Sequence, residues 1–337
     1  MAVYTDISAT EMRAFLRAYD LGGLLSFDGI IEGVENSNYI VRTEHQTVIL
    51  TLYEKRVRET DLPFFIGLME HLAGHGFTCP QPVYGRDGQA LRRLADRPAA
   101  LFTFLEGRPP ARILPLHCRE LGRALAGLHL AGADFAGTRA NDLGLPGWQR
   151  LCAAVTPDAG KLRPDLPDIL ERELSFLRQN WPEGLPAGIC HADLFPDNAF
   201  FRGQRLSGVI DFYFACTDLL AYDLAVCLNA WCFEAGGDFN ISRARALLAG
   251  YQEKRPLTAA EYRALPLLAR GAALRFLLTR LYDLLNHPPG ARVRPKDPGQ
   301  FLTRLRFHQR LESARGYGLA EPEETAAAGA RPGKDPA

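Results

Sequence analysis

The 337-residue sequence lacks a net charge, because its 39 Lys and Arg residues balance its 39 Asp and Glu residues. Such a balance gives no bulk attraction to nucleic acid or to a membrane surface. No apolar run approaches the length that crosses a bilayer, and the N-terminus lacks a basic segment followed by an apolar core. We therefore expect a cytoplasmic protein with no nucleic-acid or membrane partner.

The sequence also lacks any C-x-x-C pair, although it contains seven cysteines. An odd, scattered set of cysteines in a chain without a secretion signal predicts free thiols, and it argues against a disulfide framework or a zinc site. The length suits two domains or one large bilobal domain, and an apolar content of 47% is typical of a globular protein.

What the sequence does contain is a cluster of polar residues in the segment GICHADLFPDNAFFRGQRLSGVIDFYF, at positions 188–214. His191, Asp193, Asn198 and Asp211 have the spacing of a phosphotransferase catalytic loop followed by a metal-binding aspartate. Asp193 can orient an attacking hydroxyl group and accept its proton. Asn198 and Asp211 offer the oxygen ligands that Mg²⁺ prefers when it accompanies the phosphates of ATP.

The residues around this cluster predict short strands that would hold it. Apolar runs at 187–190, 199–201 and 206–210 predict three strands, with a turn at 203–204. A structural alternative is that the aspartates are ordinary turn and strand-capping residues. Four polar residues in this order, each beside a predicted strand, favour phosphoryl transfer.

The HADLFPDN loop and the IDF segment resemble those of the aminoglycoside phosphotransferase and choline kinase superfamily, which is related to the protein kinases. Within it, the chain most resembles the bacterial homoserine kinases of that fold. The pieces that carry this closer resemblance are EGVENSNYIV at 32–41, ILTLYEKR at 49–56, LPFFIGLMEHL at 62–72, FLEGRPP at 104–110, NDLGLPGW at 141–148 and ARGAALRFLLTRLYD at 269–283. The resemblance implies transfer of the γ-phosphoryl group of ATP, with Mg²⁺, to the side-chain hydroxyl of L-homoserine. The product would be O-phospho-L-homoserine, on the way to threonine.

The pattern of elements agrees with an α+β, two-lobed protein-kinase-like fold. Residues 1–104 predict an N-terminal, nucleotide-covering lobe, in which five antiparallel strands surround a helix at 62–73. Residues 105–318 predict a mostly helical lobe for catalysis and acceptor binding. The expected elements are a helix at 8–19, strands at 29–41, 47–53, 83–84, 90–94 and 99–104, and helices at 116–131, 168–180, 219–233, 242–253, 259–286 and 298–313. The composition of 319–337 predicts a disordered tail.

The nucleotide would lie against the turn between the first two expected strands, which contains Gly33, Asn36, Ser37 and Asn38. Small polar residues beside a glycine let backbone amides approach phosphate oxygens, although such a segment is also typical of a plain hairpin.

The usual lysine of the third kinase strand is replaced in this chain by Thr51. Lys55, with Arg56 beside it, is the nearest basic residue and the candidate to hold the phosphates. A solvated basic pair at a strand end is the structural alternative.

For the acceptor, the resemblance places helices of the C-terminal lobe around the pocket. Arg270 and Arg275, in the apolar stretch 259–286, are therefore candidates to hold a carboxylate. Arg280 and Asp283 are three residues apart, so a local ion pair accounts for them. Asp223 matches an aspartate that braces the catalytic loop in the superfamily, and His191 is expected to support that loop without transferring protons.

Two other functions compete with this interpretation. The acceptor could be choline, an aminoglycoside, methylthioribose or another amino alcohol, although the arginine-rich helix argues against cationic acceptors. Alternatively, the chain could be an inactive kinase fold that serves as a binding module, which the substitution at Thr51 favours and the intact set of Asp193, Asn198 and Asp211 opposes.

Overall fold

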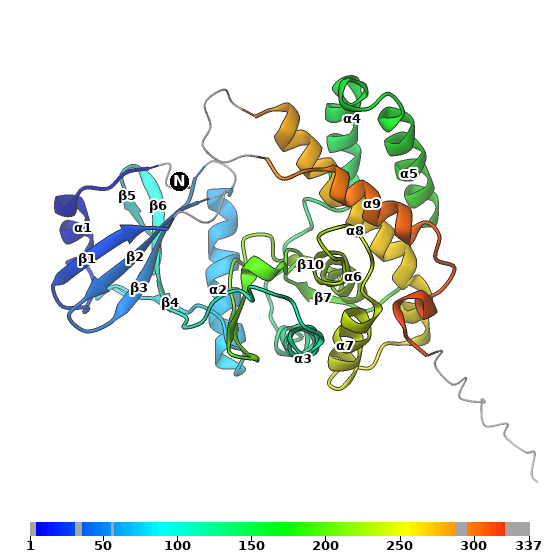
Figure 1. The fold of residues 1–337 in the computed structure, drawn as a ribbon. Helices are drawn as coiled ribbons and strands as arrows, with labels where there is room; N and C mark the ends of the chain where they lie inside the picture. The colour runs from blue at the N-terminus through cyan, green and yellow to red at the C-terminus, as the bar shows by residue number, and fades with distance from the viewer. Residues whose placement is uncertain (1–4, 31–35, 55–56, 288–294, 321–337) are drawn as a thin grey trace, which may run out of the picture.

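The computed structural model describes residues 5–30, 36–54, 57–287 and 295–320, which form two lobes of unequal size (Figure 1). The small lobe is an antiparallel sheet with two α-helices and one short 3₁₀ helix, and the large lobe is mainly helical. This arrangement confirms the predicted α+β, two-lobed kinase-like fold. The predicted tail at 319–337 lies almost entirely outside the described residues.

The small lobe is built on a sheet with the strand order β1-β2-β3-β6-β4, in which β5 also pairs with β6. All the pairs are antiparallel. The strands are β1 Leu24–Gly29, β2 Ser37–Thr43, β3 Thr47–Leu52, β4 Pro82–Val83, β5 Arg92–Leu94 and β6 Arg97–Thr103, and the helices are α1 Ala9–Leu16, η1 Glu59–Asp61 and α2 Leu62–Gly74.

The two faces of this sheet have different neighbours because side chains alternate along a strand. On β3, Val48 and Leu50 are fully buried in the core that the sheet forms with α1. Ile49 and Thr51 lie on the opposite face. On β6, Phe102 belongs to the core that is shared with α2 and the large lobe. This second face is therefore the one that looks toward the large lobe.

The prediction of one strand over 29–41 is wrong. The chain forms β1 at Leu24–Gly29 and β2 at Ser37–Thr43, so the sheet has six strands where five were expected. The segment LLSFDG contains Ser, Asp and Gly, which rarely favour strands. Its antiparallel pairing with β2 satisfies its backbone, and this tertiary contact cannot be seen in a local pattern.

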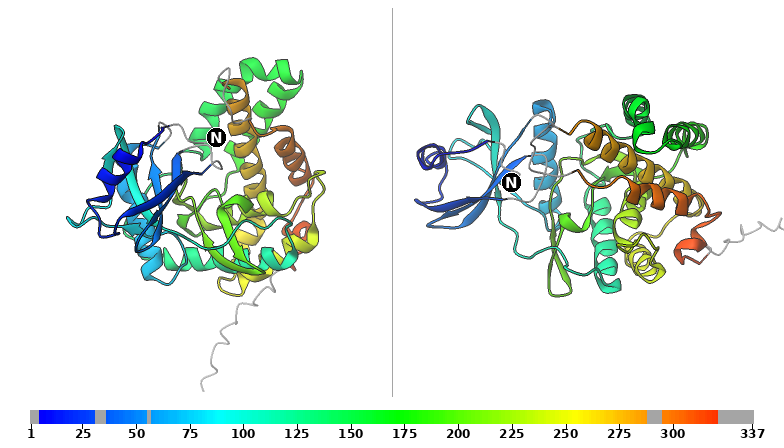
Figure 2. Two further views of the ribbon diagram at one scale, coloured as in Figure 1. Left: turned by 60° about the vertical axis from the view of Figure 1, so that its left-hand side comes forward. Right: turned by 45° about the horizontal axis from the view of Figure 1, so that its top comes forward.

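In the large lobe one long helix, α8, contacts α4, α5, α6 and α9, and a second group is formed by α3 packed against α7. Two short antiparallel strand pairs, β7 with β10 and β8 with β9, lie between this helical body and the small lobe (Figure 2). The elements are α3 Pro115–Ala131, α4 Leu145–Leu162, α5 Leu166–Asn180, β7 Ala187–Cys190, η2 Pro196–Asn198, β8 Ala199–Arg202, β9 Arg205–Val209, β10 Cys216–Leu219, α6 Leu220–Trp231, α7 Ile241–Gln252, α8 Ala259–Leu285, α9 Gly299–His308 and η3 Ala314–Tyr317.

Helix α4 and strand β10 were not predicted. Helix α4 contains Pro157 in its interior, and proline in that position normally argues against a helix. Trp148 is nevertheless fully buried, and the packing of α4 against α5 and α8 stabilises the helix. Some predicted helices end at other residues than expected. Helix α1, for example, was predicted over 8–19 and ends at Leu16.

The predicted free thiols are confirmed, because all seven cysteines are buried and unpaired. Within the described part of the chain, no helix has both the length and the apolar character needed to cross a bilayer.

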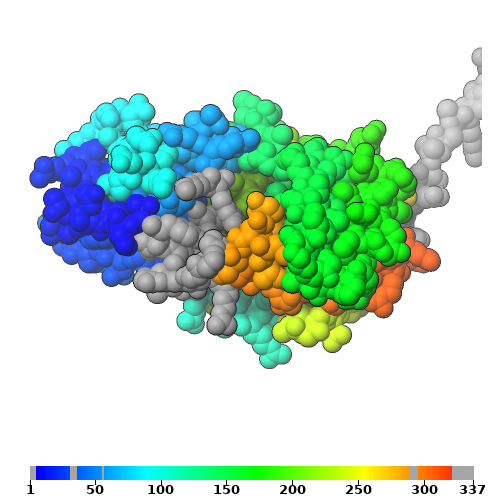
Figure 3. All heavy atoms as spheres, turned by 90° about the horizontal axis from the view of Figure 1, so that it is seen from above, coloured from blue at the N-terminus to red at the C-terminus, as the bar shows by residue number. Residues whose placement is uncertain are grey.

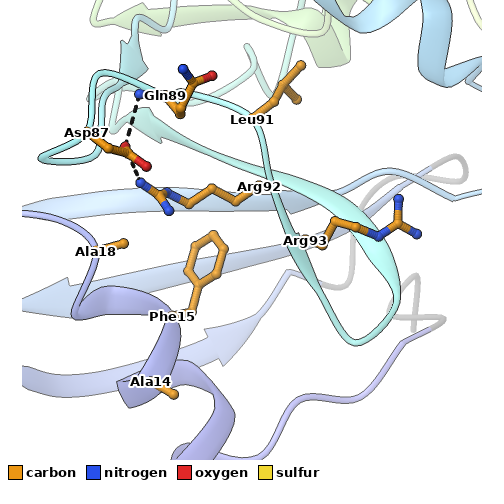
Figure 4. A pocket seen from close by; sticks show the side chains of 8 residues that line it. All are labelled: Ala14, Phe15, Ala18, Asp87, Gln89, Leu91, Arg92 and Arg93. Atoms are coloured by element: carbon orange, nitrogen blue, oxygen red, sulfur yellow. Dashed lines mark hydrogen bonds and ion pairs between the residues drawn. The ribbon is translucent and has the colours of Figure 1, made fainter.

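Seen from above, the small lobe (blue) and the helices α4 and α5 (green) lie toward opposite ends of the molecule, and the C-terminal part of α8 (orange) lies between them (Figure 3). The small lobe has a shallow hollow of about 430 Å³ beside α1 and β5 (Figure 4). Asp87 accepts hydrogen bonds there from the backbone of Gln89 and from Arg92. None of the predicted site residues lines this hollow.

Candidate active site

The two short strand pairs bring the predicted catalytic and metal-binding residues together. Strand β7 ends at Cys190, directly before the loop that carries Asp193, and β9 ends at Val209, two residues before Asp211. The side chain of Asn198 donates a hydrogen bond to the backbone oxygen of Asp193 at 2.8 Å and lies 3.4 Å from its carboxylate. The Ile210 amide donates to the Asn198 carbonyl at 2.9 Å, which links the loop to the segment with Asp211.

His191 is a support of this loop and is completely buried. Its Nε2 lies 3.0 Å from the Ile210 carbonyl, which can only accept, so Nε2 donates and carries the proton. Its Nδ1 then accepts from the Asp193 amide at 3.2 Å. Burial lowers the pKa of His191, which agrees with a neutral ring. The predicted scaffolding role therefore fits the geometry, and direct contact with a substrate does not.

Asp223 anchors the start of the catalytic loop through hydrogen bonds to its backbone. Its two carboxylate oxygens accept the backbone amides of His191 at 2.7 Å and of Ala192 at 2.8 Å. His129 lies 3.2 Å from the same carboxylate. Burial raises the pKa of Asp223, but the bond to His129 and the nearby charges outweigh it, so the pKa lies below its usual range. The carboxylate therefore stays ionised, as the predicted bracing role requires.

Replacing Asp223 by Ala should lower the free energy of unfolding by about 2–4 kcal/mol, because two buried amides lose their acceptor. It should also lower kcat, since the loop loses its anchor. Thermal unfolding and steady-state rates would measure the two effects. The control is Asp158→Ala, whose carboxylate is paired with Lys161 on the surface and should change stability by less than about 0.5 kcal/mol. Equal stability of the two variants would contradict the bracing role.

Other backbone groups of the loop are satisfied by buried side chains of the helical body. Trp231 donates from its indole nitrogen to the Leu194 carbonyl at 2.9 Å. Arg275 donates to the Ala192 carbonyl. The carbonyl groups on both sides of Asp193 in the chain are therefore held by buried side chains, which makes the loop a rigid support.

Backbone strain marks the same two places. In the described part of the chain, four non-glycine residues have positive φ, and two of them are Ala192 (φ 61°) and Asp211 (φ 65°). Left-handed backbone of this kind costs about 1–3 kcal/mol for most residues and is concentrated at functional sites. The strained turns aim the side chains of the catalytic loop and of the aspartate after β9.

Asn198 and Asp211 have the chemistry to hold a hard cation. The amide nitrogen of Asn198 is used by Asp193, which leaves its oxygen for another partner. Burial raises the pKa of Asp211, and the nearby His191 and the Tyr213 amide offset only part of this effect. A partly buried carboxylate that is poorly compensated fits a position where a divalent cation would supply the missing positive charge.

On the small lobe, the residues predicted to contact the nucleotide have different environments. Ser37 is completely buried and donates to Glu54 at 2.8 Å, and the side chain of Asn36 accepts from the Glu54 amide. These two residues therefore support the end of the sheet. Asn38 is only partly buried and accepts from Thr51 at 2.8 Å, on the face toward the large lobe. Gly33 and Lys55 lie outside the described residues.

The two lobes also meet through tyrosines beside the site. Tyr53, which follows β3, donates to Tyr213 at 3.3 Å, and their rings are 5.2 Å apart in an edge-to-face arrangement. Because Tyr213 is two residues after Asp211, this contact couples the small sheet directly to the segment of the proposed metal ligand.

The structure argues against Arg270 as a ligand of the acceptor. Its guanidinium group makes two parallel hydrogen bonds to Glu173, at 2.7 and 2.8 Å, and lies 3.9 Å from the ring of Phe176. Glu173 belongs to α5, so this is an ion pair that joins α5 to α8. The charge of Arg270 is already compensated.

Arg275 lies at the site but in a different role from the one predicted. Its side chain is 1% exposed, and one nitrogen is 3.9 Å from the Asp193 carboxylate. Because Arg275 also donates to the Ala192 carbonyl, it is placed to position the loop that carries Asp193. Arg280, for which a local pair with Asp283 was expected, instead donates to the Asp297 carbonyl and the Gln300 side chain, both at 2.8 Å.

Comparison with known proteins agrees with this geometry. The profile of the phosphotransferase enzyme family matches residues 26–257. Homoserine kinases of Xanthobacter autotrophicus and Parvibaculum lavamentivorans are 62% and 60% identical to the chain. Each alignment covers 95% of this chain, and they cover 100% and 99% of the two relatives.

Solved structures show the same fold at much lower identity. An amicoumacin kinase has a TM-score of 0.66 at 14% identity, over 91% of this chain and 93% of that one. A spectinomycin phosphotransferase has a TM-score of 0.65 at 12% identity, over 93% and 98%. At these identities the likeness extends to the fold alone.

Proposed function

Because this chain belongs to the phosphotransferase enzyme family, we propose that it transfers the γ-phosphoryl group of ATP to the side-chain hydroxyl of L-homoserine and forms O-phospho-L-homoserine. The observation that carries this assignment is the identity of 62% to a homoserine kinase over 95% of the chain, together with an intact Asp193, Asn198 and Asp211 set. This reaction would be a step toward threonine, and the enzyme would act in the cytoplasm.

In this mechanism Asp193 receives the acceptor. Its side chain is 20% exposed, so it can accept a hydrogen bond from a substrate hydroxyl, and the hydrogen-bonded loop beneath it fixes its position. As the hydroxyl oxygen attacks phosphorus, its proton passes to Asp193 and the bond to the leaving ADP oxygen breaks. Phosphoryl transfer requires little covalent chemistry from the protein. Catalysis therefore depends mainly on positioning the two substrates and on stabilising the charge of the transition state.

We propose that Asn198 and Asp211 hold the magnesium ion that accompanies ATP. The ion, when bound, neutralises charge that develops on the phosphate oxygens. Burial raises the pKa of Asp211, so a nearby cation would stabilise its ionised carboxylate. Asn198 would add its neutral amide oxygen as a second ligand of the same ion.

The nucleotide would lie between the lobes, against the face of the small sheet that carries Asn38, Ile49 and Thr51. Half-buried Ile49 offers an apolar surface, and partly buried Asn38, held by a hydrogen bond from the buried Thr51, offers a short polar group. Thr51 has no charge for the phosphates, so a basic residue such as Lys55 would be needed for that contact. Residues 1–104 would thus cover the nucleotide, and residues 105–318 would carry the catalytic and acceptor groups.

A panel of acceptors tests the assignment directly. ADP release with ATP and Mg²⁺ should be stimulated most by L-homoserine and far less by choline, methylthioribose or an aminoglycoside. Product identification by ³¹P NMR should show a phosphate monoester on the side-chain oxygen. A preference for another acceptor would overturn the homoserine assignment but keep the phosphotransferase, and binding of an ATP analogue without turnover on any acceptor would favour an inactive module.

A further inference from the structure

We propose that Arg280 and Arg304 form the subsite that binds the carboxylate of the acceptor, so that this kinase selects an amino acid and rejects an uncharged amino alcohol. The inference rests on the proposed function, because it places a ligand in the acceptor site. It replaces Arg270 and Arg275, which the sequence suggested, with two other cations of the same region.

The two arginines come from adjacent helices and share one aromatic ring. Arg280 on α8 and Arg304 on α9 have their guanidinium carbons 4.5 and 4.4 Å from the centroid of Phe301. Phe301 is completely buried, so the ring is a fixed platform for both side chains. A ring of this kind orients a planar guanidinium group and leaves its N–H edge for an anion.

Neither arginine forms an ion pair with a carboxylate within the described residues. Arg280 donates to two neutral oxygens, of Asp297 and Gln300. Arg304 has a buried terminal nitrogen, Nη1, that finds no hydrogen-bond partner in the part of the chain that the structure describes. A buried guanidinium N–H that lacks a partner is costly, so the position is suited to an incoming acceptor of hydrogen bonds.

The electrostatic surroundings agree with that geometry. Burial lowers the pKa of Arg280, and the nearby Asp297 and Asp193 offset only part of this effect. Burial and the charge of Arg280 lower the pKa of Arg304 to about 10. Both groups remain cationic at neutral pH but lack sufficient negative charge around them. An acceptor carboxylate would supply it.

This pair of cations is beside the catalytic loop. Phe195, two residues after Asp193, has its ring 6.3 Å from Phe301 and 4.8 Å from Phe276. Asp193 is also among the charges that act on Arg280. In homoserine three carbon atoms separate the hydroxyl oxygen from the carboxylate carbon. In the proposed complex, one molecule would place its hydroxyl at Asp193 and its carboxylate at the two arginines.

Arg280→Met and Arg304→Met test this subsite. Each should raise KM for L-homoserine by roughly 10- to 100-fold, the effect of losing a charge-assisted hydrogen bond, and should leave KM for ATP unchanged. The diagnostic substrate is 3-aminopropan-1-ol, which keeps the hydroxyl and ammonium groups but has no carboxylate. Its kcat/KM should be the same in wild type and variants, so the preference for homoserine should collapse.

Arg306→Met is the matched control, because Arg306 is on the same helix, is 44% exposed and lies 3.9 Å from Asp165. It should leave both substrates unaffected. Equal losses for homoserine and 3-aminopropan-1-ol would show a structural role and overturn the subsite, as would an unchanged KM for homoserine. If a Met variant unfolds, the Lys variant at that position keeps the charge without the planar fork and should still raise KM. A wild-type enzyme that is inactive on homoserine would instead refute the proposed function itself.

Discussion

Replacing Asp193 by Asn should lower kcat with ATP and L-homoserine by roughly 10²- to 10⁴-fold, because the carboxylate that accepts the hydroxyl proton is lost. The change is nearly isosteric. Asn198 donates to the backbone oxygen of residue 193, and that bond does not depend on the side chain. The loop should therefore keep its shape, and KM for ATP should stay close to the wild-type value. Steady-state kinetics at saturating concentrations of both substrates would measure the effect.

Asp197→Asn is the control for charge in the same loop. The Asp197 side chain is 75% exposed and its only described partner is Lys296, at 3.5 Å. Removal of this surface charge should change kcat by less than about threefold, since exposed pairs contribute little. A near-normal kcat for Asp193→Asn, or an equal loss in both variants, would refute the assignment of Asp193 as the base.

Replacing Asp211 by Asn should lower kcat/KM for ATP by roughly 10²- to 10³-fold, the size of effect seen when one oriented electrostatic group is removed. Asn is the suitable substitution because it tolerates the left-handed backbone of residue 211, whereas Ala would add strain. The expected cause is weaker binding of the cation. The concentration of Mg²⁺ needed for half-maximal rate should rise in Asp211→Asn and stay unchanged in Asp193→Asn.

Stability without ligands separates this metal role from a structural one. Because burial raises the pKa of Asp211, the ionised carboxylate is disfavoured in the fold, and Asn at this position should melt at the same temperature or higher. Addition of Mg²⁺ and an ATP analogue should then stabilise the wild type more than the variant. A large loss of stability in the absence of ligands would mean that Asp211 is needed for folding.

The centre of the site was predictable from sequence because its members are close in the chain. His191, Asp193 and Asn198 lie on one loop, and Asp211 follows after a hairpin whose apolar runs are readable. Local spacing therefore fixed their relative positions. The bracing role of Asp223 came from a resemblance. Its partner His129 is 94 residues away in sequence, so no local pattern could have revealed it.

The acceptor side could not be predicted because one helix carries several arginines in similar local sequence. Arg270, Arg275 and Arg280 point in different directions around α8, and their roles depend on which neighbour covers each face. Glu173 of α5 neutralises Arg270, the catalytic loop buries Arg275, and α9 brings Phe301 to Arg280. Tertiary packing determines the role of each arginine, and the periodicity of the sequence does not reveal that packing. The misplaced strand at 29–41 has the same origin, in pairing between strands.

The most direct test of the account is a crystal structure with Mg²⁺, a non-hydrolysable ATP analogue and L-homoserine. In that complex Mg²⁺ should lie about 2.0–2.1 Å from oxygens of Asn198 and Asp211, and the homoserine hydroxyl about 2.6–3.2 Å from the carboxylate of Asp193. A bound cation that these two residues do not touch, or an acceptor hydroxyl held away from Asp193, would contradict it.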